Sequence, residues 1–173
     1  MEIWTIGHSN QPLNAFVDAL RAHRIALLVD VRRFPSSRRL PHFNSPPLAA
    51  ALERHGFDYV HMEDLGGRRP PRRDSHNIAW QNAGFRGYAD YMETPAFAAA
   101  IERLLTLASE RRTAIMCAER LWRQCHRGLI ADELKARGHT VTHILSATAS
   151  EPHPYTPAAR VVEGRVSYRG ILE

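Results

Sequence analysis

The stretch IALLVDV, Ile25 to Val31, is a continuous apolar run that includes β-branched residues. A run without alternating polar residues is typical of a strand that is buried on both faces, as in parallel sheets covered by helices. Helical patterns flank it on both sides. Apolar side chains recur at helical spacing in residues 10–24, and a second helix is predicted from Ser45 to the glycine at position 56. This part of the chain therefore predicts an α/β fold.

Strands and helices continue to alternate along the rest of the chain. Further strands are predicted at residues 3–6, 57–62, 113–118 and 140–145. Further helices are predicted around 87–92, at 94–109 and at 126–137, and Ser9 or Asn10 is expected to cap the first helix. The Glu163-Gly164 pair favours a small C-terminal hairpin. We therefore expect one domain, residues 1–173, with three layers and a mostly parallel sheet of about five strands, of Rossmann-like or flavodoxin-like type.

The composition is that of an ordinary globular protein. Of its 173 residues, 44% are hydrophobic, which is enough for one domain with a core. The sequence contains no run of about 18 apolar residues, the length that a membrane-spanning helix needs. The N-terminal segment MEIWTIGHSN lacks the apolar stretch of a secretory signal. Two cysteines are too few for a disulfide scaffold. We therefore expect a cytoplasmic protein with free thiols and no membrane partner.

The positive charge of the chain is almost entirely arginine. The net charge is +5, and of the 23 basic residues only Lys135 is a lysine. Codon bias would explain this preference, but arginines also bind phosphate groups in a bidentate manner, and many of them lie in two predicted loops. One alternative is therefore that these loops bind nucleic acid through Arg38, Arg39, Phe43, Arg68, Arg69, Arg72 and Arg73.

Polar and reactive side chains follow the predicted strands, at the point where each strand ends. In parallel sheets, ligands bind at the carboxyl ends of the strands. The candidate catalytic residues there are Asp30, Glu119, Cys125 and His126, and the candidate anion-binding residues are His8, Ser9, Arg32, Ser37 and Arg127. Simpler interpretations remain open: Ser9 as a helix cap, and Asp30 as the buried partner of Arg32 or Arg127.

The triplet Cys125-His126-Arg127 opens a predicted helix, where the helix dipole and nearby cations stabilise a thiolate. It could also be a tight structural turn. Cys117 lies at a strand end, where a buried thiol is expected. Its spacing to Arg123 is that of phosphatase and rhodanese anion loops, but the segment has no glycine.

Metal binding has little support in the sequence. His8, Glu119, Cys117, Cys125 and His126 could supply ligands to a divalent metal, but no paired spacing typical of zinc sites is present. We therefore predict no cofactor.

Five motifs, TIGHSN, DVRRFPSSRRLPHFN, LGG, YADYM and MCAERLWRQCHRGLIADEL, resemble in this order the bacterial and archaeal domain-of-unknown-function family 488. The resemblance spans nearly the whole chain and implies a compact α/β domain with a common site. The motif positions are His8, Ser9, Asp30, Arg32, Pro35, Ser37, Phe43, Glu119, Cys125, His126 and Arg127. The resemblance implies no particular reaction.

Three functions are compatible with these residues. The first is a thiol-dependent hydrolase or transferase that acts on a nucleotide or nucleic acid, with Cys125 as nucleophile and arginines as anion clamps. The second is a non-catalytic protein that binds nucleic acid. The third is an accessory protein in which the polar edge of the sheet is a structural network.

Overall fold

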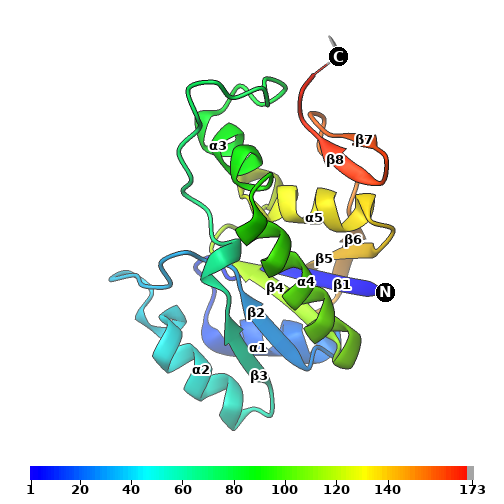
Figure 1. Ribbon diagram of the computed structural model, residues 1–173. Coiled ribbons are helices and arrows are strands. Elements are labelled where there is room, and N and C mark those ends of the chain that lie inside the picture. The colour runs from blue at the N-terminus through cyan, green and yellow to red at the C-terminus, as the bar shows by residue number, and fades with distance from the viewer. Residues whose placement is uncertain (171–173) are drawn as a thin grey trace.

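The computed structural model describes residues 1–170 and shows a twisted sheet between two layers of helices (Figure 1). The strands of this sheet are β1 (Glu2–Gly7), β2 (Leu27–Asp30), β3 (Asp58–His61), β4 (Thr113–Cys117), β5 (Thr140–Ser146) and β6 (Ala149–Pro152). Their order is β3-β2-β4-β1-β5-β6. The first five are parallel, and β6 runs antiparallel to β5 at the edge. The predicted three-layer α/β fold with a mostly parallel sheet is confirmed.

The helices divide between the two faces of the sheet. They are α1 (Leu13–Ala22), α2 (Ser45–Arg54), α3 (Ala83–Tyr91), α4 (Pro95–Glu110) and α5 (Arg127–Ala136), with short 3₁₀ turns at Pro41–Phe43, Glu63–Leu65 and Trp122–Gln124. Successive side chains of a strand point to opposite faces, and so Leu28 packs with α1 and α2 whereas Val29 packs with α3, α4 and α5. Both side chains are fully buried. Burial on both faces is what the unbroken apolar run in β2 predicts.

The C-terminal hairpin is also confirmed. It consists of β7 (Arg160–Val162) and β8 (Arg165–Ser167) and lies beside α5 (Figure 1). Glu163 and Gly164 connect the strands with positive φ angles of 52° and 74°. Two such residues between two strands are the mark of a type I′ turn.

Two local expectations differ from the structure. The edge strand β6 was not predicted, because its short segment is mostly exposed and carries no apolar alternation. The predicted cap of the first helix is wrong. Helix α1 is preceded by Pro12 and has no side-chain cap, while Ser9 lies in a left-handed turn with φ of 52° and its hydroxyl donates to the side chain of Asn10.

The sheet order brings three strand ends together. Because β4 lies between β2 and β1, Cys117 is paired with Gly7 on one side, and Met116 with Asp30 on the other. The residues that follow these three strands therefore meet at one edge of the sheet. Within residues 1–170, no helix has the length and apolar character that crossing a membrane requires.

Candidate functional site

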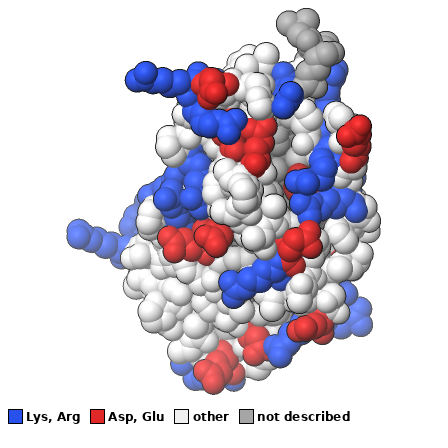
Figure 2. Space-filling model, viewed as in Figure 1, with Lys and Arg blue, Asp and Glu red and all other residues white. Residues whose placement is uncertain are grey.

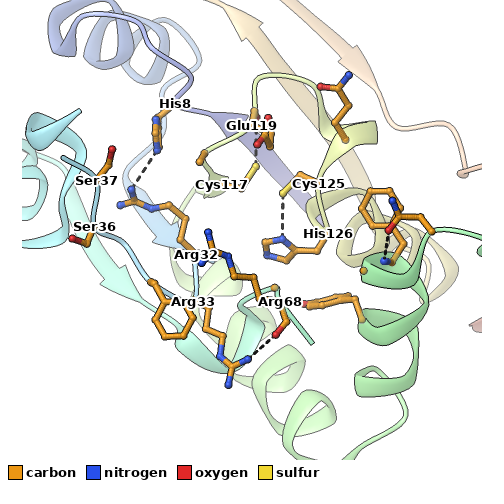
Figure 3. A pocket seen from close by; sticks show the side chains of 18 of the residues that line it. His8, Arg32, Arg33, Ser36, Ser37, Arg68, Cys117, Glu119, Cys125 and His126 are labelled. Carbon is orange, nitrogen blue, oxygen red and sulfur yellow. Dashed lines mark hydrogen bonds between the residues drawn. The ribbon is translucent and has the colours of Figure 1, made fainter. Parts of the chain in front are cut away.

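A cavity of about 610 Å³ opens at the carboxyl ends of β1, β2 and β4 (Figure 3). The loops after β1 and β2 supply one side of it, and the segment between β4 and α5 supplies the other. Of the residues predicted for the site, those that line this cavity are His8, Arg32, Ser37, Arg68, Glu119, Cys125 and His126. The edge of the sheet that the sequence indicated is thus the place where the structure forms a cavity.

Cys125 and His126 form a hydrogen-bonded pair in this cavity. The Sγ of Cys125 lies 3.2 Å from Nδ1 of His126, and Nε2 of the same ring lies 2.9 Å from the carbonyl oxygen of Val31. A carbonyl can only accept, so Nε2 carries the hydrogen. Burial lowers the pKa of His126, which keeps the ring neutral and leaves Nδ1 as an acceptor toward the thiol. The arrangement is that of a nucleophile, a base and a group that orients the base.

The pKa of Cys125 is lowered, chiefly because the Cys117 thiol hydrogen-bonds to its sulfur, and also because the backbone N–H of Arg127 donates to it. That N–H lies 3.5 Å from the sulfur at the first residue of α5. Burial acts in the opposite direction, since the side chain is only 8% exposed. The helix start and the neighbouring thiol therefore favour the thiolate at this position.

Asp30 is fully buried in an ion pair with Arg32. Its carboxylate accepts from Nε and Nη2 of Arg32, at 2.9 and 2.7 Å, and from the hydroxyl of Tyr59 at 2.5 Å. Desolvation and the Asp30 charge raise the pKa of Tyr59, so the hydroxyl stays protonated and donates. This geometry matches the structural interpretation of Asp30, as the partner of Arg32, more closely than that of a general acid.

His8 contacts the Arg32 guanidinium at Nη1, the nitrogen that does not bond to Asp30. Its Nδ1 donates to the carbonyl of Ser9 at 2.7 Å, which leaves Nε2 to accept from Nη1 of Arg32 at 3.3 Å. Burial lowers the pKa of His8 to about 4, so the imidazole is neutral. The ring also stacks on Phe43, with 4.4 Å between centroids. His8 thus positions a charged group at the wall of the cavity.

Arg127 lies outside the cavity, contrary to the prediction of an anion clamp. The side chain is 1% exposed, and its guanidinium donates to the hydroxyl of Thr5 at 2.8 Å and to the carbonyls of Glu119 and Arg120, each at 3.1 Å. These bonds fix the backbone that follows β4. Arg127 therefore holds the cavity wall from behind. Ser9, which was also predicted to bind an anion, does not line the cavity either.

The mouth of the cavity contains a basic and aromatic group of which only Arg68 was predicted from the sequence; Arg33 and Phe34 were not among the predicted site residues. Phe34 is 58% exposed, and the guanidinium groups of Arg33 and Arg68 lie 5.4 and 5.8 Å from its ring centre. Arg33 also donates to the carbonyl of Arg68 at 2.8 Å, which joins the two loops. The signal was present, because Arg33 and Phe34 follow β2 directly, but only the loop contact shows that they face the cavity.

The residues predicted for nucleic-acid binding do not form one surface. Phe43 is fully buried between α1 and the loops, so its predicted role in stacking on bases is wrong. Arg69 donates to the carbonyls of Gly66 and Glu63, and Arg72 pairs with Glu93 at 2.8 Å. The side chains of Arg38, Arg39, Arg68 and Arg73 are exposed, and of these only Arg68 lines the cavity.

Basic side chains gather on the left side of the molecule in the view of Figure 2, over the loops that follow β2 and precede α3. Acidic side chains lie among them, so this side carries mixed charge rather than a continuous basic patch.

Two further expectations can be located. Arg123, which has the spacing of an anion loop relative to Cys117, is exposed, lies over the Trp122 ring and does not line the cavity. Within residues 1–170, no three His, Cys, Asp or Glu side chains are arranged so that they could hold a metal ion.

Comparison with known proteins gives a match to a family model. The family model described as "Domain of unknown function DUF488" matches residues 12–134, which include β2, β4, the loop after β2, the segment between β4 and α5 and most of α5, but not His8. No curated protein and no solved structure matches the chain. The matched range covers more than half of the chain, and the protein therefore belongs to the DUF488 family.

Proposed function

We propose that this protein is an enzyme that uses Cys125 as a nucleophile on a phosphate-bearing substrate, with a nucleotide as the best-fitting class. One observation carries the proposal: the sulfur of Cys125 faces the unprotonated Nδ1 of a histidine whose other nitrogen is anchored on the Val31 carbonyl. A thiol, a base and an orienting group inside a cavity form the arrangement that activated nucleophiles need.

The reaction would begin with transfer of the thiol proton from Cys125 to Nδ1 of His126. The thiolate then attacks the phosphorus of the substrate and displaces the leaving oxygen, which takes the proton back from the imidazolium. Water or an acceptor alcohol then attacks the phosphorus of the resulting thiophosphate, its proton passes to Nδ1 of His126, and the S–P bond breaks to release the Cys125 thiolate. The chain would act as a hydrolase in the first case and as a transferase in the second.

The mouth of the cavity supports an anionic, aromatic substrate. Arg33 and Arg68 supply positive charge there, whereas the charge of Arg32 is offset by Asp30. The exposed ring of Phe34 offers a face on which a nucleobase can stack. Glu119 adds one carboxylate to the cavity, which would disfavour an anion placed next to it.

A nucleophilic thiol must remain reduced, so the proposal also implies a reducing compartment such as the cytoplasm. The second candidate, nucleic-acid binding without chemistry, is favoured by one observation, the exposed Phe34 between two arginines. Burial of Phe43 and the internal bonds of Arg69 and Arg72 count against it. The third candidate, a purely structural polar edge, does not explain why the cavity contains a cysteine with a lowered pKa.

The test is turnover of a panel of nucleotides by the reduced protein, followed as phosphate release. Cys125→Ala should abolish turnover and keep binding, whereas the double variant Arg33→Ala with Arg68→Ala should weaken binding. Arg123→Ala is the matched control, because this arginine lies outside the cavity. Turnover by Cys125→Ala at the parent's rate would remove the thiol mechanism. Binding that does not weaken between low and moderate salt would remove the phosphate contact.

A further inference from the structure

Both cysteines of the chain lie on the floor of this cavity. Cys117 is the last residue of β4, and Cys125 lies two residues before the start of α5. The two side chains line the same cavity and belong to the same buried cluster. Their sulfur atoms lie side by side in Figure 3, and each thiol shifts the pKa of the other.

The two thiols differ in their surroundings. Cys125 is 8% exposed and accepts from the backbone N–H of Arg127, whereas Cys117 is 1% exposed and its single S–H lies within reach of two acceptors, the Glu119 carbonyl at 3.5 Å and the sulfur of Cys125. Burial raises the pKa of Cys117, while the pKa of Cys125 is lowered chiefly by the hydrogen bond from Cys117. Cys125 therefore ionises more readily than an ordinary cysteine, whereas Cys117 keeps its proton more firmly.

We propose that Cys117 and Cys125 form a redox-active dithiol that reduces a low-molecular-weight disulfide and is itself converted to an intramolecular disulfide across the cavity floor. The proposal shares Cys125 with the proposed function, but it requires neither a phosphate-bearing substrate nor the arginines at the mouth. It gives Cys117 a chemical role that the nucleophile alone does not need.

The reaction has two exchange steps. The Cys125 thiolate attacks one sulfur of the small disulfide, which forms a mixed disulfide and releases one thiolate. Cys117 then attacks the Sγ of Cys125, its proton passes to the departing thiolate, and the second small thiol leaves. Two electrons have moved from the protein to the small disulfide, which becomes two thiols.

The order of attack follows from access and acidity. A thiolate attacks faster than a thiol, and Cys125 is the more exposed and more acidic of the two. Cys117 is too buried to meet the small disulfide first, but it contacts the sulfur that it must attack. The disulfide would close only the short segment 118–124, between a strand end and a helix start that the fold already holds together.

The experiment uses the full chain with glutathione disulfide as the probe. The reduced protein is incubated with an excess of glutathione disulfide, quenched with acid, alkylated and analysed by mass spectrometry. The parent should lose two hydrogens, carry no lasting glutathione and give a tryptic peptide pair that is joined through Cys117 and Cys125. Since the chain has only two cysteines, every thiol signal is assigned to one of them.

Two variants test the roles of the two thiols. Cys117→Ser should accumulate one glutathione on Cys125, because nothing resolves the mixed disulfide. Cys125→Ser should remain unmodified over the same time. A lasting glutathione adduct on the parent, a disulfide between two chains, or two thiols that stay free would each overturn the proposal.

The parent measurement decides the matter even if a variant folds poorly. Phosphate release by the reduced protein is measured separately. If the disulfide forms but the protein turns over no nucleotide, the dithiol proposal holds and the proposed function is refuted. If nucleotides are turned over but no disulfide forms, the proposed function holds and the dithiol proposal is refuted.

Discussion

Replacing Gly67 with alanine should uncouple His126 from Cys125. A Cβ at position 67 would lie 2.9 Å from Nδ1 of His126 and 3.3 Å from two carbon atoms of the ring. The ring has little room to give way, because Nε2 is held by the Val31 carbonyl and Tyr88 packs on the ring with 5.0 Å between centroids. The distance between Nδ1 and the thiol, 3.2 Å, should therefore lengthen beyond hydrogen-bond range.

The size of the effect follows from the loss of that single contact. Overpacking of this kind costs about 1–3 kcal/mol of unfolding free energy. A thiol that loses its neutral acceptor loses a hydrogen bond that only its protonated form makes, so it should ionise more readily; that bond is worth about 1 kcal/mol, and its loss should raise the thiolate fraction about fivefold below the midpoint of the titration. We therefore expect Gly67→Ala to react about fivefold faster with iodoacetamide at neutral pH, while the protein remains folded.

The assay is the rate of alkylation of Cys125 against pH, followed by peptide mass spectrometry. Gly84→Ala is the matched control, because Gly84 lines the same cavity and an added Cβ would meet only the side chain of Asn82, at 3.1 Å. The control should keep the parent's pH profile. If Gly67→Ala, with an unchanged circular-dichroism spectrum, gave the same profile as the parent, the reasoning that couples His126 to the thiol would be refuted.

Three further predictions concern the buried polar groups. Arg127→Met should lower the unfolding free energy by about 3 kcal/mol in urea titrations, because one buried and two part-buried acceptors lose a charged donor. Arg123→Met should change the unfolding free energy by less than about 0.5 kcal/mol, and similar losses for the two variants would contradict the structural role of Arg127. Asp30→Asn should cost about 3–5 kcal/mol, because it leaves the Arg32 guanidinium buried without its charge partner, and a cost under about 1 kcal/mol would refute this. Burial lowers the pKa of His8 to about 4, so between pH 6.5 and pH 4 the unfolded chain takes up a proton that the folded chain does not. As the pH falls over this range, the unfolding free energy of the parent should therefore decrease more steeply than that of His8→Asn. Parallel slopes for the two proteins would contradict this prediction.

The sequence predicted the parts of the fold in which one local pattern decides the outcome. Unbroken apolar runs indicated strands buried on both faces, and the Glu163-Gly164 pair indicated the hairpin turn. The edge of the sheet that carries the cavity followed from the parallel order alone, because parallel strands end at the same side. The short exposed strand β6 could not be found in this way, since it pairs through its backbone and buries little apolar surface.

The roles of single side chains were predicted less well, because they depend on contacts between distant segments. Phe43 and Phe34 are both aromatic residues in the same arginine-rich loop, yet the first is fully buried and the second is 58% exposed. Arg127 and Arg33 both follow a strand or open a helix, yet the first bonds to backbone carbonyls and the second lies at the cavity mouth. Nothing within a few residues of these positions distinguishes the two outcomes.

A chain of buried hydrogen bonds connects Arg127, which holds the wall of the cavity, with Asp132 on the same helix, α5. Arg127 donates to Thr5, and the distances continue from Thr5 to His143 (2.5 Å), from His143 to His153 (2.8 Å) and from His153 to Asp132 (2.8 Å). Arg127 can only donate and the carboxylate of Asp132 accepts, so one consistent arrangement has each group between them donating onward, which requires a neutral ring at His143. Burial lowers the pKa of His143 to about 2, in keeping with that requirement. The guanidinium that holds residues 119–120 is thus linked through these hydrogen bonds to a carboxylate four groups away, so the wall rests on this network as well as on packing.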